Sequence, residues 1–250
     1  MVRRRIPLLT AVVAALTVLL AGPVVGSAAA ATPDPVVIVN GTFGPAFFYE
    51  PLAARLRHDG YQAFIFELTN LGTGDIANTA QDLRAFVDGV RARTGAAKVD
   101  LVAHSQGVLV ARQYVKFGGG SSTVDSLVGM AGPNYGTAIA NIAAFFGAGN
   151  CLGIVACQQM AVGSAFLANL NAGDDTIGSV RYTNLYTLFD ELVRPVENAA
   201  LRDGATNVLI QSQCPLRAPD HIALALDGTT YDGIRDALRG APINLNCFAL

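Results

Sequence analysis

The stretch from Val99 to Val115 constrains the fold more strongly than any other part of the sequence. Residues 99–102 form a short apolar run typical of a strand, and the apolar residues after position 107 recur at helical spacing. Ser105 therefore lies on a tight turn between a strand and a helix. This is the pattern of a nucleophile elbow, which needs small residues two positions on either side of the serine. Ala103 and Gly107 occupy those positions, although the first is more often glycine.

The rest of the chain alternates between strand-like and helix-like segments. Strands are predicted at residues 36–39, 61–66, 126–130, 180–186 and 208–210 in addition to 99–102. Helices are predicted at 47–57, from 76 to the glycine at 95, from the elbow to the glycine at 118, and at 231–238. This alternation predicts an α/β fold with a mostly parallel sheet of about six strands and helices on both faces. Its length favours one domain, residues 32–250.

The N-terminus resembles an export signal. Arg3, Arg4 and Arg5 precede an apolar run over residues 6–20, and three alanines end at Ala31. This arrangement predicts a secretory signal peptide over residues 1–31 that is cleaved after Ala31, and so a secreted protein. The alternative is an uncleaved membrane anchor, which the prolines and glycine of residues 7–23 disfavour.

The charge of the predicted mature chain limits its partners. Cleavage removes three positive charges from a formal net charge of −2, which leaves −5. A mildly acidic protein is poorly suited to nucleic acid or to anionic membranes. Because no second long apolar span follows, we expect no stable membrane anchor after cleavage. The mature protein is also expected to be a monomer.

All four cysteines follow the predicted leader, so disulfides are expected in an exported chain. Proximity in sequence favours Cys151 with Cys157, and Cys214 with Cys247 at the two ends of the C-terminal segment; the other two connectivities stay open. A metal site is disfavoured because the chain has no Cys-x-x-Cys unit with histidines nearby.

A serine nucleophile needs a base, and the chain has only three histidines. His58 has charged neighbours on a predicted helix and is expected to be exposed. His104 precedes Ser105 on an extended strand, where successive side chains point to opposite faces, so it should pack beside the elbow. His221 lies in a loop after the last predicted strand, and is the predicted base.

The base in turn needs a carboxylate to orient it. Asp190 closely follows the strand that ends at Tyr186, so it should emerge at the same sheet edge as Ser105. Asp220 is less suitable because it adjoins His221 in sequence. The alternative for Asp190 is a solvated loop acid or a helix cap. The order Ser105, Asp190, His221 is that of an α/β-hydrolase triad.

An oxyanion hole should combine two main-chain N–H groups. One is expected from Gln106, at the start of the helix after Ser105. The other is expected from Thr42, in the glycine-containing loop 40–45 that follows the first strand, with its hydroxyl as a further candidate. The alternative is a simple glycine-rich turn.

Four stretches together resemble the secreted lipases of the α/β-hydrolase class, including small bacterial lipases and Candida-type lipase B: residues 40–44, 103–107, 183–191 and 220–221. The resemblance covers most of residues 36–240. It implies Ser105 as nucleophile, Asp190 as acid, His221 as base, and the amides of Thr42 and Gln106 as oxyanion hole. It also supports a disulfide at Cys214, although the spacing to Cys247 departs from the family's. Asn40 replaces a more usual histidine or proline.

Residues 134–178 form the least regular part of the chain. They include an apolar stretch at 141–148, the Cys151 to Cys157 loop, and a helical pattern around residues 161–170. An insertion at this place in such a fold is predicted to be a small lid or acyl-binding wall, and the alternative is a helix pair that covers the core.

These features predict a secreted serine lipase that hydrolyses acylglycerol esters at a lipid–water interface through an acyl-enzyme, with no metal or organic cofactor. A carboxylesterase or polyester hydrolase would share the triad and differ in its pocket. A secreted acyltransferase would exclude water. A non-catalytic binding module would have lost a triad member, and none is missing.

Overall fold

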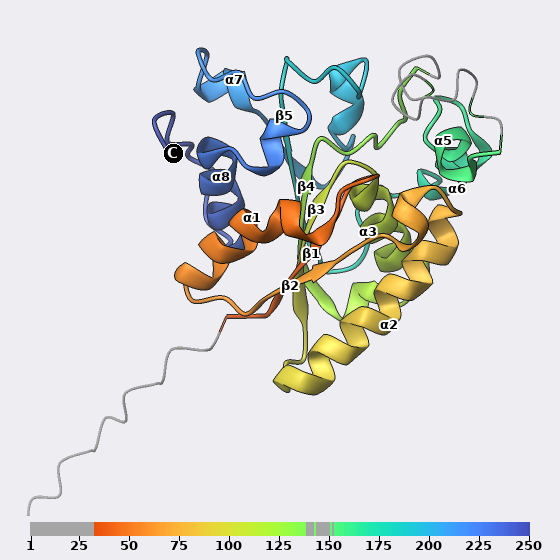
Figure 1. Ribbon diagram of the computed structural model, residues 1–250, viewed down its shortest axis with the longest axis horizontal. Helices are drawn as coiled ribbons and strands as arrows, with labels where there is room; N and C mark the ends of the chain where they lie inside the picture. Colours follow the sequence, from red (N-terminus) through yellow and green to blue (C-terminus); the bar gives the residue numbers. More distant parts are fainter. Residues whose placement is uncertain (1–32, 139–142, 144–150, 152) are drawn as a thin grey trace, which may run out of the picture. The chain divides into compact units, whose positions relative to one another are not determined.

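Six parallel strands form the centre of the protein in a computed structural model, which describes residues 33–138, 143, 151 and 153–250. The strand order is β2-β1-β3-β4-β5-β6, and every neighbouring pair is parallel (Figure 1). The predicted α/β fold with a sheet of about six strands is therefore confirmed. The strands are β1 Val36–Val39, β2 Ala63–Phe66, β3 Val99–His104, β4 Val124–Met130, β5 Arg181–Tyr186 and β6 Ala205–Leu209.

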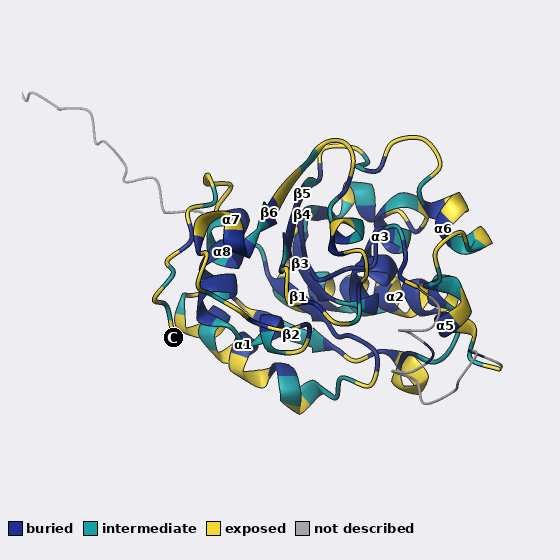
Figure 2. Ribbon diagram, turned by 90° about the horizontal axis from the view of Figure 1, so that it is seen from above, coloured by how far each residue is buried: buried dark blue, intermediate teal, exposed yellow. Residues whose placement is uncertain are grey.

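Helices cover both faces of this sheet (Figure 2). The α-helices are α1 Ala46–His58, α2 Ile76–Thr94, α3 Gln106–Phe117, α5 Val155–Gln159, α6 Ala165–Leu170, α7 Ile210–Gln213 and α8 Gly228–Leu238. Short 3-10 turns are η1 Thr69–Gly72, η2 Gly120–Ser122, η3 Val196–Ala199 and η4 Ala223–Ala225. One face of the sheet packs against α2 and α3, and the other against α1 and α8.

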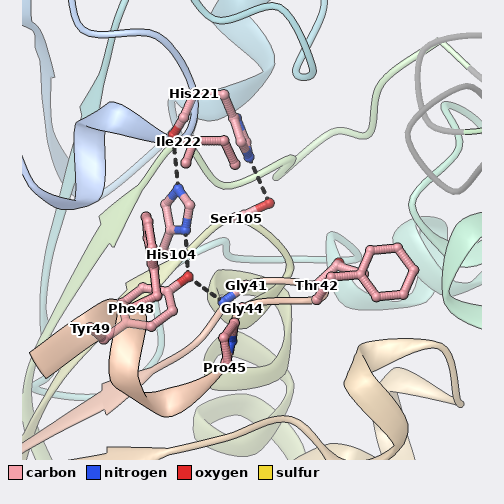
Figure 3. A pocket seen from close by; sticks show the side chains of 11 residues that line it. Gly41, Thr42, Gly44, Pro45, Phe48, Tyr49, His104, Ser105, His221 and Ile222 are labelled. Carbon is pink, nitrogen blue, oxygen red and sulfur yellow. Dashed lines mark hydrogen bonds between the residues drawn. The ribbon is translucent and has the colours of Figure 1, made fainter.

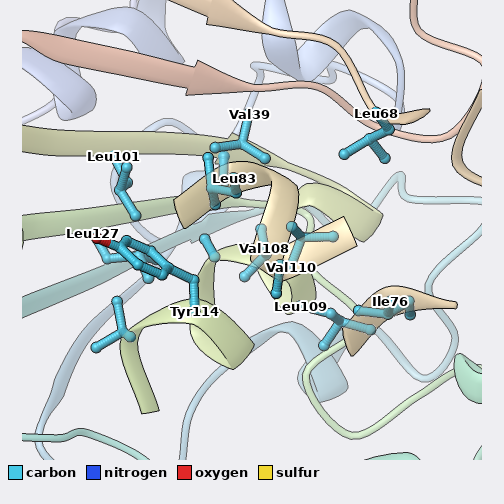
Figure 4. Packing of buried hydrophobic residues seen from close by; sticks show 14 of the residues in the cluster. Val39, Leu68, Ile76, Leu83, Leu101, Val108, Leu109, Val110, Tyr114 and Leu127 are labelled. Carbon is cyan, nitrogen blue, oxygen red and sulfur yellow. The ribbon is translucent and has the colours of Figure 1, made fainter. Parts of the chain in front are cut away.

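The core has two parts because a parallel sheet buries both of its faces. On the α2 and α3 side, Val39, Leu101 and Leu127 from the strands meet apolar side chains of the two helices (Figure 4). On the α1 and α8 side, strand residues such as Ile38 and Val128 pack against helix residues such as Leu52 and Ile234, in a second cluster. Strands β1 and β3 are buried along their whole length. Strand β1 is a continuous apolar run, whereas β3 also buries Asp100 and His104.

Several predicted segments differ from the structure at their ends, among them the last strand and the last helix. The last strand was predicted at 208–210 but covers Ala205–Leu209. Its first part was missed because β6 is a half-exposed edge strand, in which Thr206 and Asn207 face solvent and break the apolar pattern. The last helix begins at Gly228 rather than at 231. Its start is fixed by Asp227, whose Oδ1 accepts from the Thr230 N–H at 2.8 Å, as an N-cap.

The structure contains the disulfides Cys151–Cys157 and Cys214–Cys247, the two pairings that proximity favours. The second ties the end of α7 to the C-terminal segment. Among the helices of the described residues, none has the length and apolar character needed to cross a bilayer.

The described part of the predicted cap, residues 134–178, is anchored to α3 by a buried arginine. Arg112 donates to the side-chain oxygens of Asn134 and Asn171 at 3.2 and 2.9 Å, and its guanidinium lies 3.4 Å from the Asp175 carboxylate. Helix α6 packs against α3, and Gln159 of α5 bonds to the first turn of α2. The predicted apolar stretch 141–148 lies outside the described residues except for Ala143.

Candidate active site

Ser105 lies at a tight turn between β3 and α3, as the sequence predicts. Its backbone has φ 55° and ψ −126°, a conformation that costs free energy for any residue other than glycine. Gly107 makes this turn possible, because a Cβ atom there would lie 2.5 Å from the carbonyl oxygens of Val39 and Asn40. Helix α3 can therefore approach β1 closely, and the Ser105 side chain stands clear of the sheet.

The structure brings Ser105 together with His221 and Asp190. His221 Nε2 lies 2.9 Å from Ser105 Oγ, and His221 Nδ1 lies 3.0 and 2.9 Å from the two carboxylate oxygens of Asp190. Asp190 and His221 are each 1% exposed. A carboxylate can only accept, so Nδ1 carries the proton and Nε2 is free to accept from the Ser105 hydroxyl. This is the hydrogen-bond order of a serine nucleophile, its base and an orienting acid.

The loop after β5 holds Asp190 and also touches His221. Asp190 Oδ1 accepts from the N–H groups of Leu192 and Val193 at 2.9 and 2.8 Å, so this buried carboxylate is fully paired. The alternative of a solvated loop acid does not fit this burial. Glu191 accepts from the His221 N–H at 3.1 Å. No role was predicted for Glu191 from the sequence, although its position beside Asp190 is a usable signal.

Thr42 and Gln106 lie side by side next to Ser105. The Thr42 hydroxyl donates to Gln106 Oε1 at 2.5 Å, so this hydroxyl is already engaged. Neither main-chain N–H of these two residues has a hydrogen-bond partner among the described residues. The Gln106 N–H is the first of α3, where N–H groups are free and the helix dipole favours negative charge. The arrangement is suited to two donors for an oxyanion, and that role stays a prediction.

A cavity of about 190 Å³ opens beside Ser105 and His221 (Figure 3). Its walls come mainly from the loop after β1 and the start of α1, with Ile222 from the loop that carries His221. Phe43, Pro45 and Phe48 give this space a largely apolar lining. It is suited to a small apolar group attached to the atom that Ser105 attacks.

The other two histidines differ in environment. His58 is exposed on α1 and lies 3.2 Å from Asp59, as predicted. His104 is buried beside the elbow, as predicted, and burial together with the charge of His221 lowers its pKa to about 3. Its hydrogen bonds to Tyr49 and to the His221 main chain were not predicted from the sequence. Strand alternation predicted only that His104 points away from Ser105 and packs beside the elbow.

The described residues bring three carboxylates together at the opposite edge of the sheet. Ligand atoms of Asp34, Asp100 and Asp125 lie within 4.8 Å of one another. The Asp125 carboxylate is already paired with Arg181 at 2.8 Å and with Lys98 at 3.6 Å. These acids lie at the amino ends of the strands, so they have no contact with the cavity at Ser105.

Comparison with known proteins agrees with this geometry. Residues 33–229 match the family model described as Lipase (class 2). The structure is similar to lipase B of Aspergillus fumigatus, with a TM-score of 0.72 at 19% identity over 85% of this chain and 54% of that one. It is also similar to the mature lipase BlEst2 of Bacillus licheniformis, with a TM-score of 0.68 at 17% identity over 84% of this chain and 93% of that one. The chain thus spans about half the length of the Aspergillus protein, and at these identities the likeness shows the fold.

Proposed function

This chain belongs to the class 2 lipase family, whose members are serine ester hydrolases of the α/β-hydrolase type, and from this premise we propose that it hydrolyses carboxylic esters of acylglycerols. The observation that carries the proposal is the continuous hydrogen-bond chain from Ser105 Oγ through His221 to Asp190. Its two links of 2.9 Å lie beside an apolar cavity that is open to substrate.

In the proposed reaction, Ser105 Oγ attacks the ester carbonyl carbon while His221 Nε2 takes the hydroxyl proton. The N–H groups of Thr42 and Gln106 stabilise the oxyanion. The tetrahedral intermediate then loses the alcohol, which receives the proton from His221, and an acyl-enzyme remains. Water attacks this acyl-enzyme and gives a proton to His221. The second tetrahedral intermediate then breaks its bond to Ser105 Oγ, which takes the proton back from His221, and the fatty acid is released. Asp190 stabilises the imidazolium in both halves.

Exposed apolar side chains surround the same edge of the sheet. They lie in the first turn of α1 and in the segments that follow β5 and α7, and among them are Phe47, Leu188, Phe189, Leu216 and Ile222. Phe47 is 77% exposed and Leu216 is 98% exposed. Apolar surface of this kind, near a site that cleaves esters, supports contact with a lipid–water interface.

We also propose that the chain is secreted after cleavage of residues 1–31 and acts as a monomer without a stable membrane anchor. The two disulfides support export to an oxidising compartment. Mass spectrometry of protein recovered from the medium of an expressing culture tests this. A mature N-terminus at or within a few residues of Thr32 is expected, and retention of the full leader would contradict it.

A carboxylesterase for short soluble esters is the second candidate. The described cavity of about 190 Å³ is below the roughly 300 Å³ at which drug-sized ligand pockets begin, which favours short acyl groups. The difference from a lipase lies in substrate length and not in the reacting residues.

Hydrolysis of p-nitrophenyl esters of increasing acyl length, together with a triglyceride emulsion, tests both candidates. We expect activity on long chains and on the emulsion, and a loss of at least about 10³-fold in Ser105→Ala because the nucleophile is gone. Activity confined to short esters would select the esterase. Equal rates in the two proteins, with unchanged circular dichroism, would remove Ser105 as the nucleophile and the proposed function with it.

A further inference from the structure

A second buried hydrogen-bond chain lies beside the Ser105, His221 and Asp190 chain. The Gly41 N–H donates to Tyr49 Oη at 2.8 Å, Tyr49 Oη lies 2.8 Å from His104 Nδ1, and His104 Nε2 lies 2.9 Å from the carbonyl oxygen of His221 (Figure 3). These hydrogen bonds join the loop after β1, helix α1, strand β3 and the loop after α7. It is buried, and none of its bonds belongs to the reaction proposed above.

The direction of each hydrogen bond follows from the chemistry of the partners. The His221 carbonyl can only accept, so His104 Nε2 carries the proton. Burial keeps His104 neutral and raises the pKa of Tyr49, so His104 Nδ1 accepts the Tyr49 hydroxyl proton. The Tyr49 oxygen in turn accepts from Gly41. Every donor and acceptor in the chain has one defined role, so no member can rotate without leaving a buried polar group unpaired.

This hydrogen-bond chain ends at the oxyanion loop on one side and at the base His221 on the other, and both must act on the same ester. Gly41 precedes Thr42, the expected oxyanion donor, and a Cβ at Gly41 would lie 3.1 Å from both His104 Nδ1 and Ser105 Cβ. The loop after β1 therefore lies directly against His104. At the other end, the main chain of His221 is held on both sides, by His104 at its carbonyl and by Glu191 at its N–H.

We propose that Tyr49 and His104 are positioning residues that fix the oxyanion loop relative to the base His221. The inference rests on the proposed ester hydrolysis and adds two residues to it. Neither touches the reacting atoms; they act through Gly41 and through the His221 backbone. Their loss should lower the rate at which bound ester reacts and leave binding of the ester nearly unchanged. The reason is that displacement of the oxyanion donor and the base weakens their stabilisation of the transition state.

Steady-state kinetics on a soluble short ester, p-nitrophenyl butyrate, provides the test. Tyr49→Phe leaves the Gly41 N–H and His104 Nδ1 without partners, and we expect kcat to fall about 10- to 100-fold with KM within about 2-fold. His104→Leu should have a similar effect. His104→Gln should recover most of the rate, since an amide can donate to the His221 carbonyl and accept from Tyr49. In the double variant Tyr49→Phe/His104→Leu, kcat should fall about as much as in either single variant, because both substitutions interrupt the same hydrogen-bond chain.

Tyr114→Phe is the matched control. Tyr114 is as buried as Tyr49, and its hydroxyl shares a 2.6 Å hydrogen bond with Thr123 Oγ1 at the opposite end of α3 from Ser105. Tyr114→Phe should lower the thermal midpoint about as much as Tyr49→Phe does, since the hydrogen bond lost is of the same kind. It should keep kcat within about 2-fold, because this bond lies away from Ser105.

The proposal fails if Tyr49→Phe matches this control in kcat, if His104→Gln is no better than His104→Leu, or if the losses multiply in the double variant. Should His104→Leu not fold, the comparison of Tyr49→Phe, Tyr114→Phe and His104→Gln decides. Activity that survives Ser105→Ala would instead overturn the proposed function itself.

Discussion

Aspartates are buried at both ends of the strands, at the carboxyl edge of the sheet and at the amino edge, but the two differ in the hydrogen-bond donors around them. At the carboxyl edge, Asp190 accepts from His221 and from two main-chain N–H groups. At the amino edge, Asp100 is 3% exposed, and its Oδ1 has no partner among the described residues, as is also true of the nearby Ser126 hydroxyl. Burial and the charges of Asp34 and Asp125 raise the pKa of Asp100 to about 8.

The difference shows what burial of a carboxylate requires. A buried charge is stable where several donors are arranged around it. A buried carboxyl with fewer donors, such as Asp100, which has a hydrogen bond to the Ser126 main chain and an Oδ1 unpartnered within the described part of the chain, holds its proton instead. The same substitution, aspartate to asparagine, should therefore have opposite consequences at the two edges. It should remove activity at the carboxyl edge and add stability at the amino edge.

The largest effect is expected for Asp190→Asn. An amide offers His221 Nδ1 one acceptor oxygen and one NH₂ donor in place of two acceptor oxygens. It therefore favours the His221 tautomer with the proton on Nε2, which cannot act as the base, and kcat should fall about 10³- to 10⁴-fold. Steady-state hydrolysis of p-nitrophenyl butyrate measures this, with circular dichroism to check the fold. A loss below about 10-fold would mean that another acid orients His221, and Glu191, whose carboxylate already contacts the His221 N–H, would be the first residue to replace next.

A smaller effect is expected at Thr42, whose side chain joins the loop after β1 to Gln106 at the start of α3. Thr42→Val removes the hydroxyl that donates to Gln106 Oε1 and keeps the main-chain N–H. Gln106 then has a buried acceptor without a partner, and we expect kcat to fall about 10-fold through displacement of the loop. Thr42→Ser is the control and should restore the rate. A loss of 10² or more in the valine variant would assign the hydroxyl itself as an oxyanion donor.

The sequence predicted the fold and the neighbourhood of the site because both depend on local patterns. The apolar strand, the small residues around Ser105 and the helical repeat after it are each visible over a few positions. Asp190 and His221 could be selected because a parallel sheet brings the loops after its strands to one edge. The scarcity of histidine made the choice of His221 possible by elimination.

The partners of His104 could not be predicted in the same way. Its bonds reach Tyr49, 55 positions earlier, and His221, 117 positions later, and no repeat or motif links these residues. The strand 208–210 was misplaced for a related reason, since an edge strand has a weak apolar pattern. Contacts of this kind depend on how α1 and the loop after α7 pack, which is a property of the whole fold.

The smallest effect, and the one that tests the amino edge, is expected for Asp100→Asn. The carboxyl titrates near pH 3.8 when unfolded and near 8 in the fold, so between these values the folded chain keeps a proton that the unfolded chain has lost. Wild-type stability therefore declines as pH rises from about 4 to 8, and the asparagine variant is free of this decline. Thermal and urea unfolding should give equal stabilities near pH 4 and an advantage of about 1–3 kcal/mol for the variant near pH 8, with ester hydrolysis unchanged. Asp174→Asn, an exposed acid on the surface, should show no such pH-dependent gain. If Asp100→Asn is less stable than wild type at pH 8, the ionised carboxylate is paired at this edge as well, and the contrast with Asp190 disappears.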